Sequence, residues 1–422
     1  MAAPPPLSLI LPFEDARRVV AQHASQAVPS RVETVDLLHA TGRNLAEQIT
    51  ADRDLPPFPR STRDGYAVRA ADLTKLPVTL RVLGEIKAGP SPARPAIKSG
   101  EAYAIMTGAP VPDGADAVVM VEYSSQNGDS AEITKTVTRE ENVVAQGAEA
   151  KRDSLLLDRG TRLNESAIAL AASVGKSKLN VFVRPRVAVL TTGDEIVAVD
   201  AEIGPAQIRN SNSYSLAAQI QQAGGEPVLL PIAPDEPRHL RQLIEQGLQC
   251  DLLIMTGGVS MGRYDLVEQV LAELKADFFF TGAKIQPGRP VVFGRVSRHA
   301  ASASPERQSH TYFFGLPGNP VSTMVTFELF ARPMLEALAG MSLGPLAFLH
   351  ARLKSEIKVK SGLTRFLPAI FSGEYANTQV ELVPWQGSGD IAARVRSNCY
   401  VVIPPDREQI AAGEWVAVML TR

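Results

Sequence analysis

Between residues 184 and 340 the sequence alternates between short apolar runs and amphipathic runs, and this alternation constrains the fold more than any other feature. RVAVLTTG, EPVLLPIAPD and DLLIMTGG have the character of buried strands, whereas SLAAQIQQAGG, PRHLRQLIEQGLQ and DLVEQVLAELKA repeat apolar residues with the period of a helix. Strands that alternate with helices predict βαβ units around a parallel sheet, in which ligands bind beyond the carboxyl ends of the strands. We therefore expect an α/β domain over residues 184–340.

The flanking regions differ in composition, and a chain of 422 residues is too long for one core. FEDARRVVAQHA and LNESAIALAASVG have the apolar periodicity of helices. The sequence between them is rich in Pro, Gly and Val and has short runs of alternating apolar and polar residues, such as VTLRVLGEI and AVVMVEY. The pattern predicts a helical discontinuous domain (1–50 and 147–183) with a small β domain inserted at 51–146. The β-type runs after residue 340 predict a C-terminal β barrel over residues 341–422.

Charge and cysteine usage exclude several classes of protein. The net charge is −2 and no basic stripe is present, which is evidence against a nucleic-acid partner. No apolar run reaches the roughly 18–20 residues of a membrane span, and MAAPPPLSLI lacks the features of a signal peptide. The two cysteines, Cys250 and Cys399, are isolated in the sequence and predict neither a zinc site nor a disulfide framework. A cytoplasmic location is the expectation.

Two glycine-bearing loops follow two of the predicted parallel strands, namely TTGDE (191–195) and TGGVSMGRYD (256–265). One interpretation is structural: tight strand-to-helix turns, with Asp265 capping the next helix. The other is a pocket of backbone N–H groups for a phosphate, since glycines let the amides turn inward and a helix N-terminus adds positive potential. The spacing matches neither the dinucleotide-binding fingerprint nor the P-loop.

The acidic residues of these loops bear on the choice. A carboxylate and a phosphate oxygen about 4 Å apart repel by roughly 4 kcal/mol at an effective dielectric constant of 20. The favourable interaction of a negative charge with a helix N-terminus is typically only about 0.3–1 kcal/mol. A phosphate beside Asp194, Glu195 and Asp265 therefore requires a cation, and oxygen ligands together with phosphate favour Mg²⁺. If no phosphate binds, these residues are only caps.

Two rigid loops follow, within KIQPGRPVVFG (284–294) and FFGLPGNPVSTMVTFELF (313–330), each with a Pro-Gly pair and a further proline. They are either simple connections between a strand and a helix, or rigid loops that position Lys284, Arg289 and Ser322 to bind an anion. Asn319 is the expected N-cap of a helix that has Pro320 in its first turn. Asp64-Gly65 and Asp113-Gly114, outside this region, are turn signals by themselves.

Together these motifs resemble the MoeA family, which includes the E domains of gephyrin and the plant protein Cnx1. The motifs are SxxDGYA (61–67), TGAPVPDGAD (107–116), TTGDE (191–195), GGVSMGxxD (257–265), IQPGRP (285–290) and LPGNPVS (316–322), and they occur in family order. The resemblance implies a molybdopterin molybdenumtransferase, which inserts molybdenum from molybdate into adenylylated molybdopterin and releases AMP with the help of Mg²⁺. It also implies a homodimer of four-domain subunits and contact with a molybdopterin adenylyltransferase.

The resemblance also implies roles for individual residues. In the family pattern, Asp64, Thr107, Glu195 and Asp265 are catalytic, and Glu195 and Asp265 also serve the metal. Asp64 and Thr107 come from the partner subunit. The residues that bind molybdopterin and its nucleotide are Thr192, Gly193, Asp194, Gly257, Gly258, Ser260, Pro317, Gly318 and Asn319. The molybdate pocket consists of Lys284, Arg289, Ser322, Arg365 and Ser388, because cations and hydroxyls suit a small dianion that has only acceptor oxygens.

The sequence departs from the commonest family pattern at the pocket, where Gln286 and Arg289 replace frequent lysines. Two other functions stay open at this point. One is a non-catalytic scaffold of the same fold, as in gephyrin, although this sequence has no attached adenylyltransferase domain. The other is a hydrolase that acts on a molybdopterin nucleotide.

Overall fold

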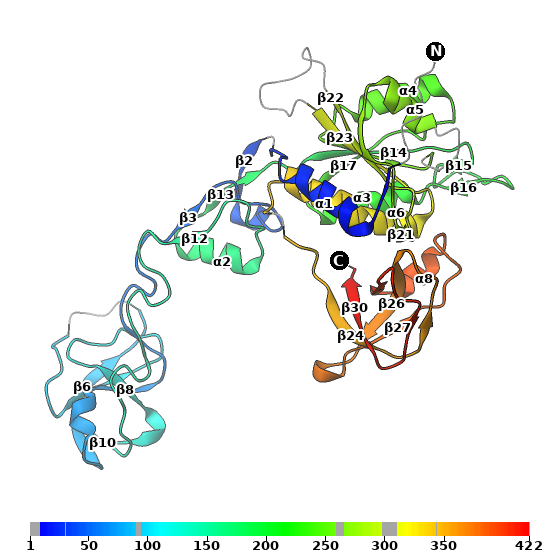
Figure 1. Cartoon of the computed structure of the whole chain (residues 1–422). Helices are drawn as coiled ribbons and strands as arrows, with labels where there is room; N and C mark the ends of the chain where they lie inside the picture. Colours follow the sequence, from blue (N-terminus) through cyan, green and yellow to red (C-terminus); the bar gives the residue numbers. More distant parts are fainter. Residues whose placement is uncertain are drawn as a thin grey trace. The chain divides into compact units, whose positions relative to one another are not determined.

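The structure is a computed structural model that describes residues 9–29, 31–89, 94–258, 266–297, 310–342 and 344–421 (Figure 1). The chain forms two compact units. The larger unit comprises Met1–Ala46, Arg159–Asn164 and Leu179–Arg422, and the smaller unit comprises Glu47–Asp158 and Glu165–Lys178. Because this division into two units does not test the four predicted domain boundaries, those boundaries stay predictions.

The larger unit contains the expected α/β sheet, with the strand order β17-β14-β18-β23-β22-β19. The first four strands are parallel, as the alternation of strands and helices predicted. The last two are antiparallel to their neighbours. The sequence has no helical pattern between residues 281 and 309 that predicts the crossover required for parallel pairing. The strands are β17 (Glu226–Leu229), β14 (Arg186–Thr191), β18 (Leu252–Thr256), β23 (His310–Leu316), β22 (Val292–Ser297) and β19 (Asp277–Phe280).

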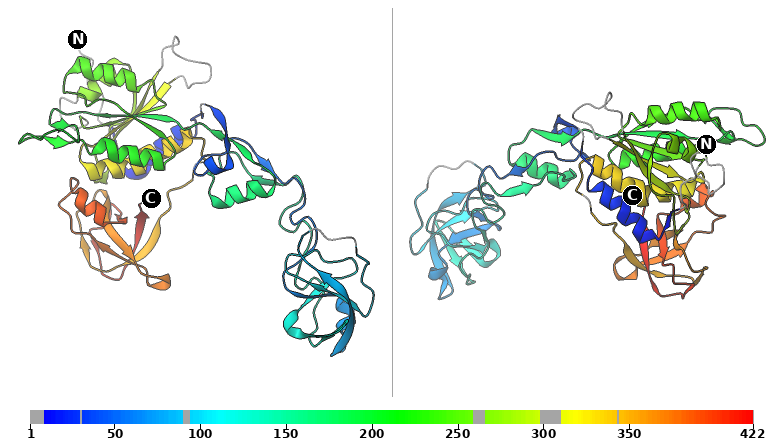
Figure 2. Two further views of the ribbon diagram at one scale, coloured as in Figure 1. Left: turned by 180° about the vertical axis from the view of Figure 1, so that it is seen from behind. Right: turned by 45° about the horizontal axis from the view of Figure 1, so that its top comes forward.

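Helices cover both faces of this sheet (Figures 1 and 2). Side chains alternate along β18: Leu252 and Ile254 join one core, and Leu253 and Met255 join the other. The two faces explain why the strands read as continuous apolar runs. One face carries α4 (Pro237–Gly247) and α5 (Leu266–Glu273). The other carries α1 (Phe13–Ala24), α3 (Asn212–Gln222), α6 (Pro320–Thr326) and α7 (Arg332–Leu338), with a π-helical turn (Phe327–Ala331) between α6 and α7.

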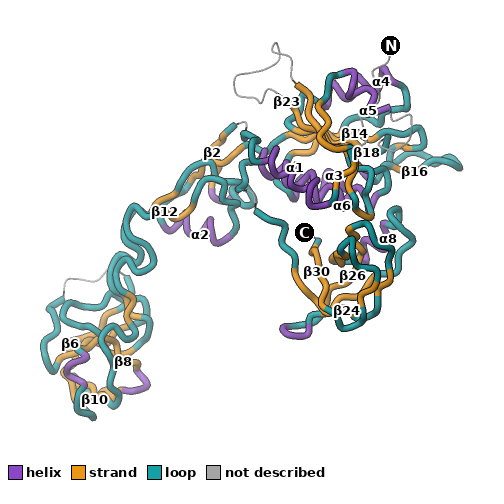
Figure 3. The backbone as a smooth tube through the Cα atoms, in the orientation of Figure 1, coloured by secondary structure: helices purple, strands orange, loops and turns teal. Residues whose placement is uncertain are grey.

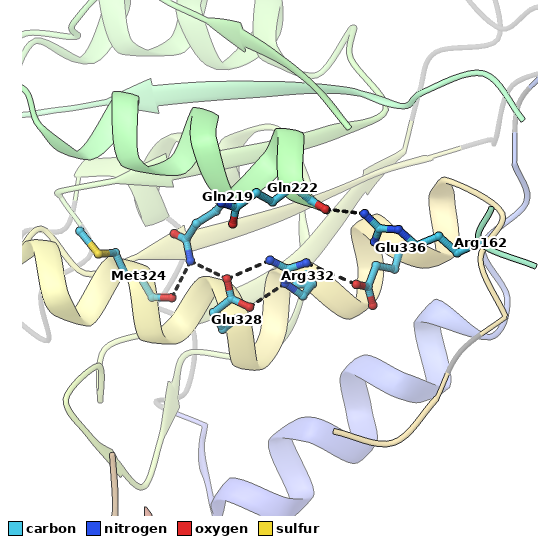
Figure 4. Close-up of polar contacts among 7 residues, drawn as sticks. All are labelled: Arg162, Gln219, Gln222, Met324, Glu328, Arg332 and Glu336. Carbon is cyan, nitrogen blue, oxygen red and sulfur yellow. Dashed lines mark hydrogen bonds and ion pairs between the residues drawn. The ribbon is translucent and has the colours of Figure 1, made fainter. Parts of the chain in front are cut away.

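A buried ionic network joins α3 to the α6–α7 segment (Figure 4). Arg332 is 2% exposed; it pairs with Glu328 at 2.6 Å and with Glu336 at 3.5 Å. Gln219 of α3 donates to a carboxylate oxygen of Glu328 at 2.7 Å. Burial alone would lower the pKa of Arg332, but the two glutamates outweigh burial and raise it. The network therefore keeps a guanidinium charged inside the unit and fixes the helix that begins at the LPGN loop.

The C-terminal part of the larger unit is a closed barrel, as predicted. Its strands pair in the order β26-β27-β24-β30-β28, and β28 pairs again with β26. They are β24 (Leu349–Leu353), β26 (Thr364–Ser372), β27 (Gln379–Leu382), β28 (Cys399–Ile403) and β30 (Trp415–Leu420), with α8 (Ile391–Arg396) before β28. The short β21 (Ile285–Gln286) adds to β26 in parallel, so the IQPGRP loop lies against the barrel.

Short pairs complete the larger unit. They are β1 (Ile10–Leu11) with β20 (Gly282–Ala283), β2 (Val32–Asp36) with β13 (Lys178–Phe182), β15 (Ile196–Val197) with β16 (Ile208–Arg209), and β25 (Ile357–Lys358) with β29 (Gln409–Ile410). None of the helices in the described part of the chain combines the length and apolar character needed to cross a membrane.

The smaller unit consists mainly of strands and loops (Figure 3), as its Pro-, Gly- and Val-rich sequence predicted. One sheet has the order β8-β5-β7-β6-β10-β9. Its strands are β5 (Gly65–Val68), β6 (Val78–Ile86), β7 (Glu101–Ile105), β8 (Ala117–Met120), β9 (Ser124–Asn127) and β10 (Ser130–Ile133). The short pairs are β3 (Ile49–Thr50) with β12 (Leu155–Leu157), and β4 (Arg60–Ser61) with β11 (Val143–Val144). The predicted second helix is α2 (Glu165–Ser173), and Gly175 follows it with φ +80°.

Candidate functional site

Three loops of the larger unit meet at the carboxyl edge of the parallel strands. The backbone N–H of Thr192 donates to the carbonyl of Thr256 at 3.0 Å, which joins the first two loops. A Cβ atom at Gly257, where φ is +85°, would clash with the carbonyl oxygen of Thr192. A Cβ at Gly318 would lie 3.6 Å from the Cα of Gly257. Glycine at 257 is therefore required both by the backbone conformation and by the close approach of the neighbouring loop.

The first loop does not offer the amide pocket that its glycine suggested. The N–H groups of Thr192 and Gly193 already donate to the carbonyls of Thr256 and Ala233. The Thr192 hydroxyl, in contrast, is buried and has no hydrogen-bond partner among the described residues. A buried hydroxyl without a partner is unfavourable, and a phosphate oxygen would satisfy it.

The second loop is described only as far as Gly258. Ser260 and Asp265 lie outside the described residues, so the structure does not place either of them. Their predicted roles, in phosphate binding and at the metal, stay predictions.

A third carboxylate joins the acids of the TTGDE loop. The backbone N–H of Asp235 donates to the Asp194 carboxylate at 3.0 Å. Burial raises the pKa of Asp235, and the neighbouring charges of Asp194 and Glu195 raise it further. Sequence reasoning missed Asp235; the available signal was its position after a strand that ends at the same sheet edge, in the sequence PIAPD.

This crowding of negative charge is the kind of environment that a cation relieves. Yet no three His, Cys, Asp or Glu side chains within the described ranges are arranged as ligands of one metal ion. The two observations are compatible. Carboxylates repel one another over several ångströms, whereas metal ligands must lie close enough to contact the same ion. The fourth candidate ligand, Asp265, lies in the segment that is not described.

Beside the loops, the larger unit has a cavity of about 420 Å³. Three of the five predicted molybdate-pocket residues line it: Arg289, Ser322 and Ser388. Pro317 and Asn319, which were predicted to bind molybdopterin, line it as well. Ser322 is buried in α6, and Ser388 precedes α8 on the barrel. The full lining is Ile285, Gln286, Pro287, Gly288, Arg289, Pro290, Pro317, Asn319, Ser322, Leu363, Trp385, Gly387 and Ser388.

The other two predicted cations lie differently. Arg365 is buried in β26, and its Nη1 has no hydrogen-bond partner among the described residues. It is paired in register with Gln286, which lines the cavity. Lys284 is exposed and is not among the lining residues. Sequence reasoning did not identify Trp385 or Leu363 as part of this cavity.

Asn319 corrects one expectation. It occupies the N-cap position of α6, but its side chain makes no capping hydrogen bond. Its Nδ2 donates instead to the Ser388 hydroxyl at 2.8 Å. Tertiary contact with the barrel loop thus replaces the local cap.

In the smaller unit, Asp64 and Thr107 form a local pair. The backbone N–H of Thr107 donates to the Asp64 carboxylate at 2.6 Å, and its hydroxyl donates to the same oxygen at 2.8 Å. These two hydrogen bonds, the backbone one first, lower the pKa of Asp64. The exposed carboxylate is therefore held in its charged form and in one orientation.

Comparison with known proteins covers almost the whole chain. Three family models match in order: the MoeA N-terminal region (domains I and II) at residues 11–175, a probable molybdopterin binding domain at 188–337, and the MoeA C-terminal region (domain IV) at 350–421.

Individual relatives agree with the family models. A molybdopterin molybdenumtransferase from a Nostoc species is 34% identical over 92% of this chain and 88% of its own length. One from Haemophilus influenzae is 32% identical over 92% and 94%. A crystal structure of a molybdopterin biosynthesis MoeA protein from Pyrococcus horikoshii has a TM-score of 0.76 at 28% identity, covering 98% of this chain and 100% of that one. The chain therefore belongs to the MoeA family.

Proposed function

We propose that this protein inserts molybdenum from molybdate into adenylylated molybdopterin, releasing AMP and forming the molybdenum cofactor. Its relatives in the family carry the name molybdopterin molybdenumtransferase. The observation that carries the proposal is the position of residues 317–319. Gly318 approaches Gly257 of the glycine loop, and Pro317 and Asn319 line the cavity. One loop therefore serves both a candidate phosphate site and a candidate oxyanion site.

The cavity suits molybdate. Arg289 supplies a guanidinium, Ser322 and Ser388 supply hydroxyls, and the unpartnered Nη1 of Arg365 lies in the adjoining strand. A dianion whose oxygens only accept hydrogen bonds is best held by charge-assisted donors of this kind. Lys284 contributes through its positive charge, at longer range. Leu363 and Trp385 add apolar surface to the lining of the cavity.

The three loops suit the phosphate part of the substrate. The backbone of Gly257, Gly258 and Ser260 holds the molybdopterin phosphate, and the hydroxyl of Thr192 donates to it. Glu195 and Asp265 hold Mg²⁺, with Asp235 as a third acidic group beside Asp194. When bound, Mg²⁺ neutralises phosphate charge and stabilises the AMP that leaves.

The rest of the proposal concerns assembly. The protein acts in the cytoplasm as a homodimer, and Asp64 and Thr107 of one subunit serve the site of the other. A molybdopterin adenylyltransferase delivers the substrate. The smaller unit's Asp64–Thr107 pair supports this role, because it presents a fixed, exposed carboxylate.

The test is incubation with adenylylated molybdopterin, Mg²⁺ and molybdate, with AMP and active cofactor as the readouts. Molybdenum insertion predicts that both products form together and that cofactor needs molybdate. A hydrolase would release AMP at the same rate without molybdate and give no cofactor. A scaffold would release no AMP in either mixture. Omission of Mg²⁺ tests the metal requirement in the same assay.

A further inference from the structure

The side chain of Asn212 joins two of the loops at the candidate site. It is the first residue of α3 and is 8% exposed. Its Nδ2 donates to the hydroxyl of Thr256 at 3.0 Å and to the carbonyl of Gly318 at 2.7 Å. Thr256 precedes the glycine pair 257–258, and Gly318 belongs to the LPGN loop. One buried amide therefore fixes the distance between both loops.

These contacts continue to the anion cavity. The hydroxyl of Thr256 donates to the carbonyl of Pro317 at 3.1 Å, and Nδ2 of Asn319 donates to the hydroxyl of Ser388 at 2.8 Å. The N–H of Val321 also donates to the carbonyl of Ser388, at 2.9 Å. Both Pro317 and Ser388 line the cavity. Two hydrogen-bonded routes thus connect the glycine loop to the 317–319 loop and to the barrel side of the oxyanion pocket: one directly from Thr256 to Pro317, and one through Asn212 to Gly318.

The two polar atoms of the Asn212 side chain differ in their contacts. Its Oδ1 is buried and has no hydrogen-bond partner in the described part of the chain. An unsatisfied buried carbonyl opposes folding, so the two hydrogen bonds donated by Nδ2 have to offset that cost. The donor side of the amide is what this position uses.

We propose that Asn212 is a positioning residue that couples the two substrate sites. When adenylylated molybdopterin occupies the glycine loop, Thr256 and the 317–319 loop are held in one arrangement, and the pocket around Ser388 is already formed for molybdate. By linkage, molybdate then favours binding of the nucleotide substrate by the same factor. This inference rests on the proposed function and concerns how its two sites communicate.

Asn210 provides a matched control. It is also an asparagine and also 8% exposed, two residues earlier in the same turn. Its side chain donates to the hydroxyl of Ser213 at 2.9 Å and accepts from the N–H of the same residue at 3.1 Å. It also accepts from the hydroxyl of Thr191, at the start of the TTGDE loop, at 3.3 Å. Among the described residues, its side chain forms no hydrogen bond with the 256–258 or 317–319 loops. Asn210→Ala therefore removes an amide of equal burial and leaves the hydrogen bonds of Asn212 to both loops in place.

The experiment measures initial rates of AMP release as molybdate is varied, at low and at saturating adenylylated molybdopterin. In the unmodified protein, the apparent KM for molybdate should fall at least about 5-fold when the nucleotide substrate saturates, the lower range of typical coupling. In Asn212→Ala, the apparent KM for molybdate should differ by less than about 2-fold between low and saturating nucleotide substrate. Asn210→Ala should keep the difference seen in the unmodified protein. Thermal melting should show a similar loss of stability for both variants.

Three outcomes overturn the inference. Asn212→Ala with undiminished coupling would show that communication between the two sites does not need this side chain. Equal loss of coupling in Asn210→Ala would reduce the effect to general loosening of the turn. An active unmodified protein without any coupling would refute the communication itself while leaving the proposed function intact. Failure of the proposed function would be visible separately, as no molybdate-dependent release of AMP.

Discussion

The side-chain amide of Asn319 lies 2.8 Å from the hydroxyl of Ser388, so the helix α6 of the α/β part and the loop before α8 of the barrel are joined at the cavity. The backbone of Ser388 also accepts a hydrogen bond from Val321. Because this second bond does not depend on the serine side chain, the hydroxyl can be removed without separating the loops.

Ser388→Ala should therefore weaken molybdate binding with little loss of stability. A hydrogen bond to a charged group contributes roughly 1.5–3 kcal/mol, so the Kd for molybdate should rise about 10- to 100-fold. Quenching of Trp385, which lines the cavity, reports binding in a Trp415→Phe background. Ser361→Ala, which removes an exposed barrel hydroxyl bonded to Glu408, is the control and should leave the Kd unchanged. An unaltered Kd in Ser388→Ala would remove this hydroxyl from the pocket.

Arg365→Ala should weaken molybdate binding about 10- to 100-fold, because a hydrogen bond to a charged group contributes roughly 1.5–3 kcal/mol. The affinity for adenylylated molybdopterin alone should change little. The readout is the molybdate dependence of AMP release. Arg407→Ala, which removes an exposed barrel arginine paired with Glu414, should behave as the unmodified protein. Unchanged molybdate dependence in Arg365→Ala would place the anion elsewhere.

Asp235→Asn should raise stability at neutral pH. The pKa of Asp235 is raised in the folded protein by burial and by Asp194 and Glu195. Such a group stabilises the fold fully only below its unfolded pKa, and the contribution is lost as pH rises through the folded pKa. Asparagine cannot ionise, so the gain should appear at pH 7 and vanish below the ordinary aspartate value of 3.8. Thermal melts from pH 3 to 7 measure it.

The matched control for that experiment is Asp200→Asn, at an exposed position of the same unit. It should show no pH-dependent gain. A gain of equal size in both variants would assign the effect to net charge. Destabilisation by Asp235→Asn at every pH would contradict the repulsion.

Thr107→Val should raise the pKa of Asp64, but not to the value of a free aspartate. The backbone N–H of Thr107, the larger contribution, still donates to the carboxylate, and only the hydroxyl is lost. Thr107→Ser retains both donors and should leave the pKa as it is. NMR titration of the Asp64 carboxyl carbon provides the measurement. A Thr107→Val titration identical to that of the unmodified protein would mean that the hydroxyl does not hold the carboxylate.

Mixing two inactive variants, Asp64→Ala and Glu195→Ala, should restore activity if each site uses both residues from different subunits. In a mixed C₂ dimer one site then carries both lesions and the other carries neither. Random assortment makes about half of the dimers mixed, so the activity should approach a quarter of the unmodified level. AMP release is measured after subunit exchange, verified with differently tagged subunits. A mixture that exchanges but stays inactive would refute the shared site.

Much of the fold could be predicted from the sequence because its signals are local. Alternation of apolar runs identified three of the four parallel strands, β14, β17 and β18, and the helices between them, and the α1 prediction matches its bounds at Phe13 and Ala24. The two antiparallel strands at the edge were not foreseen. Their direction follows from the connection between strands, and a short apolar run does not state how it is connected.

The candidate site shows the same division. The sequence by itself determined which residue types are present: glycines at 257 and 258, acids after Gly193, and serines and arginines in the loops near prolines. Only the tertiary structure decided which of these meet. The backbone N–H groups of Thr192 and Gly193 donate to other backbone carbonyls, and the side chain of Asn319 bonds Ser388 instead of capping its helix. Asp235 lies near the acidic residues Asp194 and Glu195, and Trp385 lines the cavity. Such contacts join residues far apart in the chain, and their geometry depends on how sheet, helices and barrel pack, which no local pattern encodes.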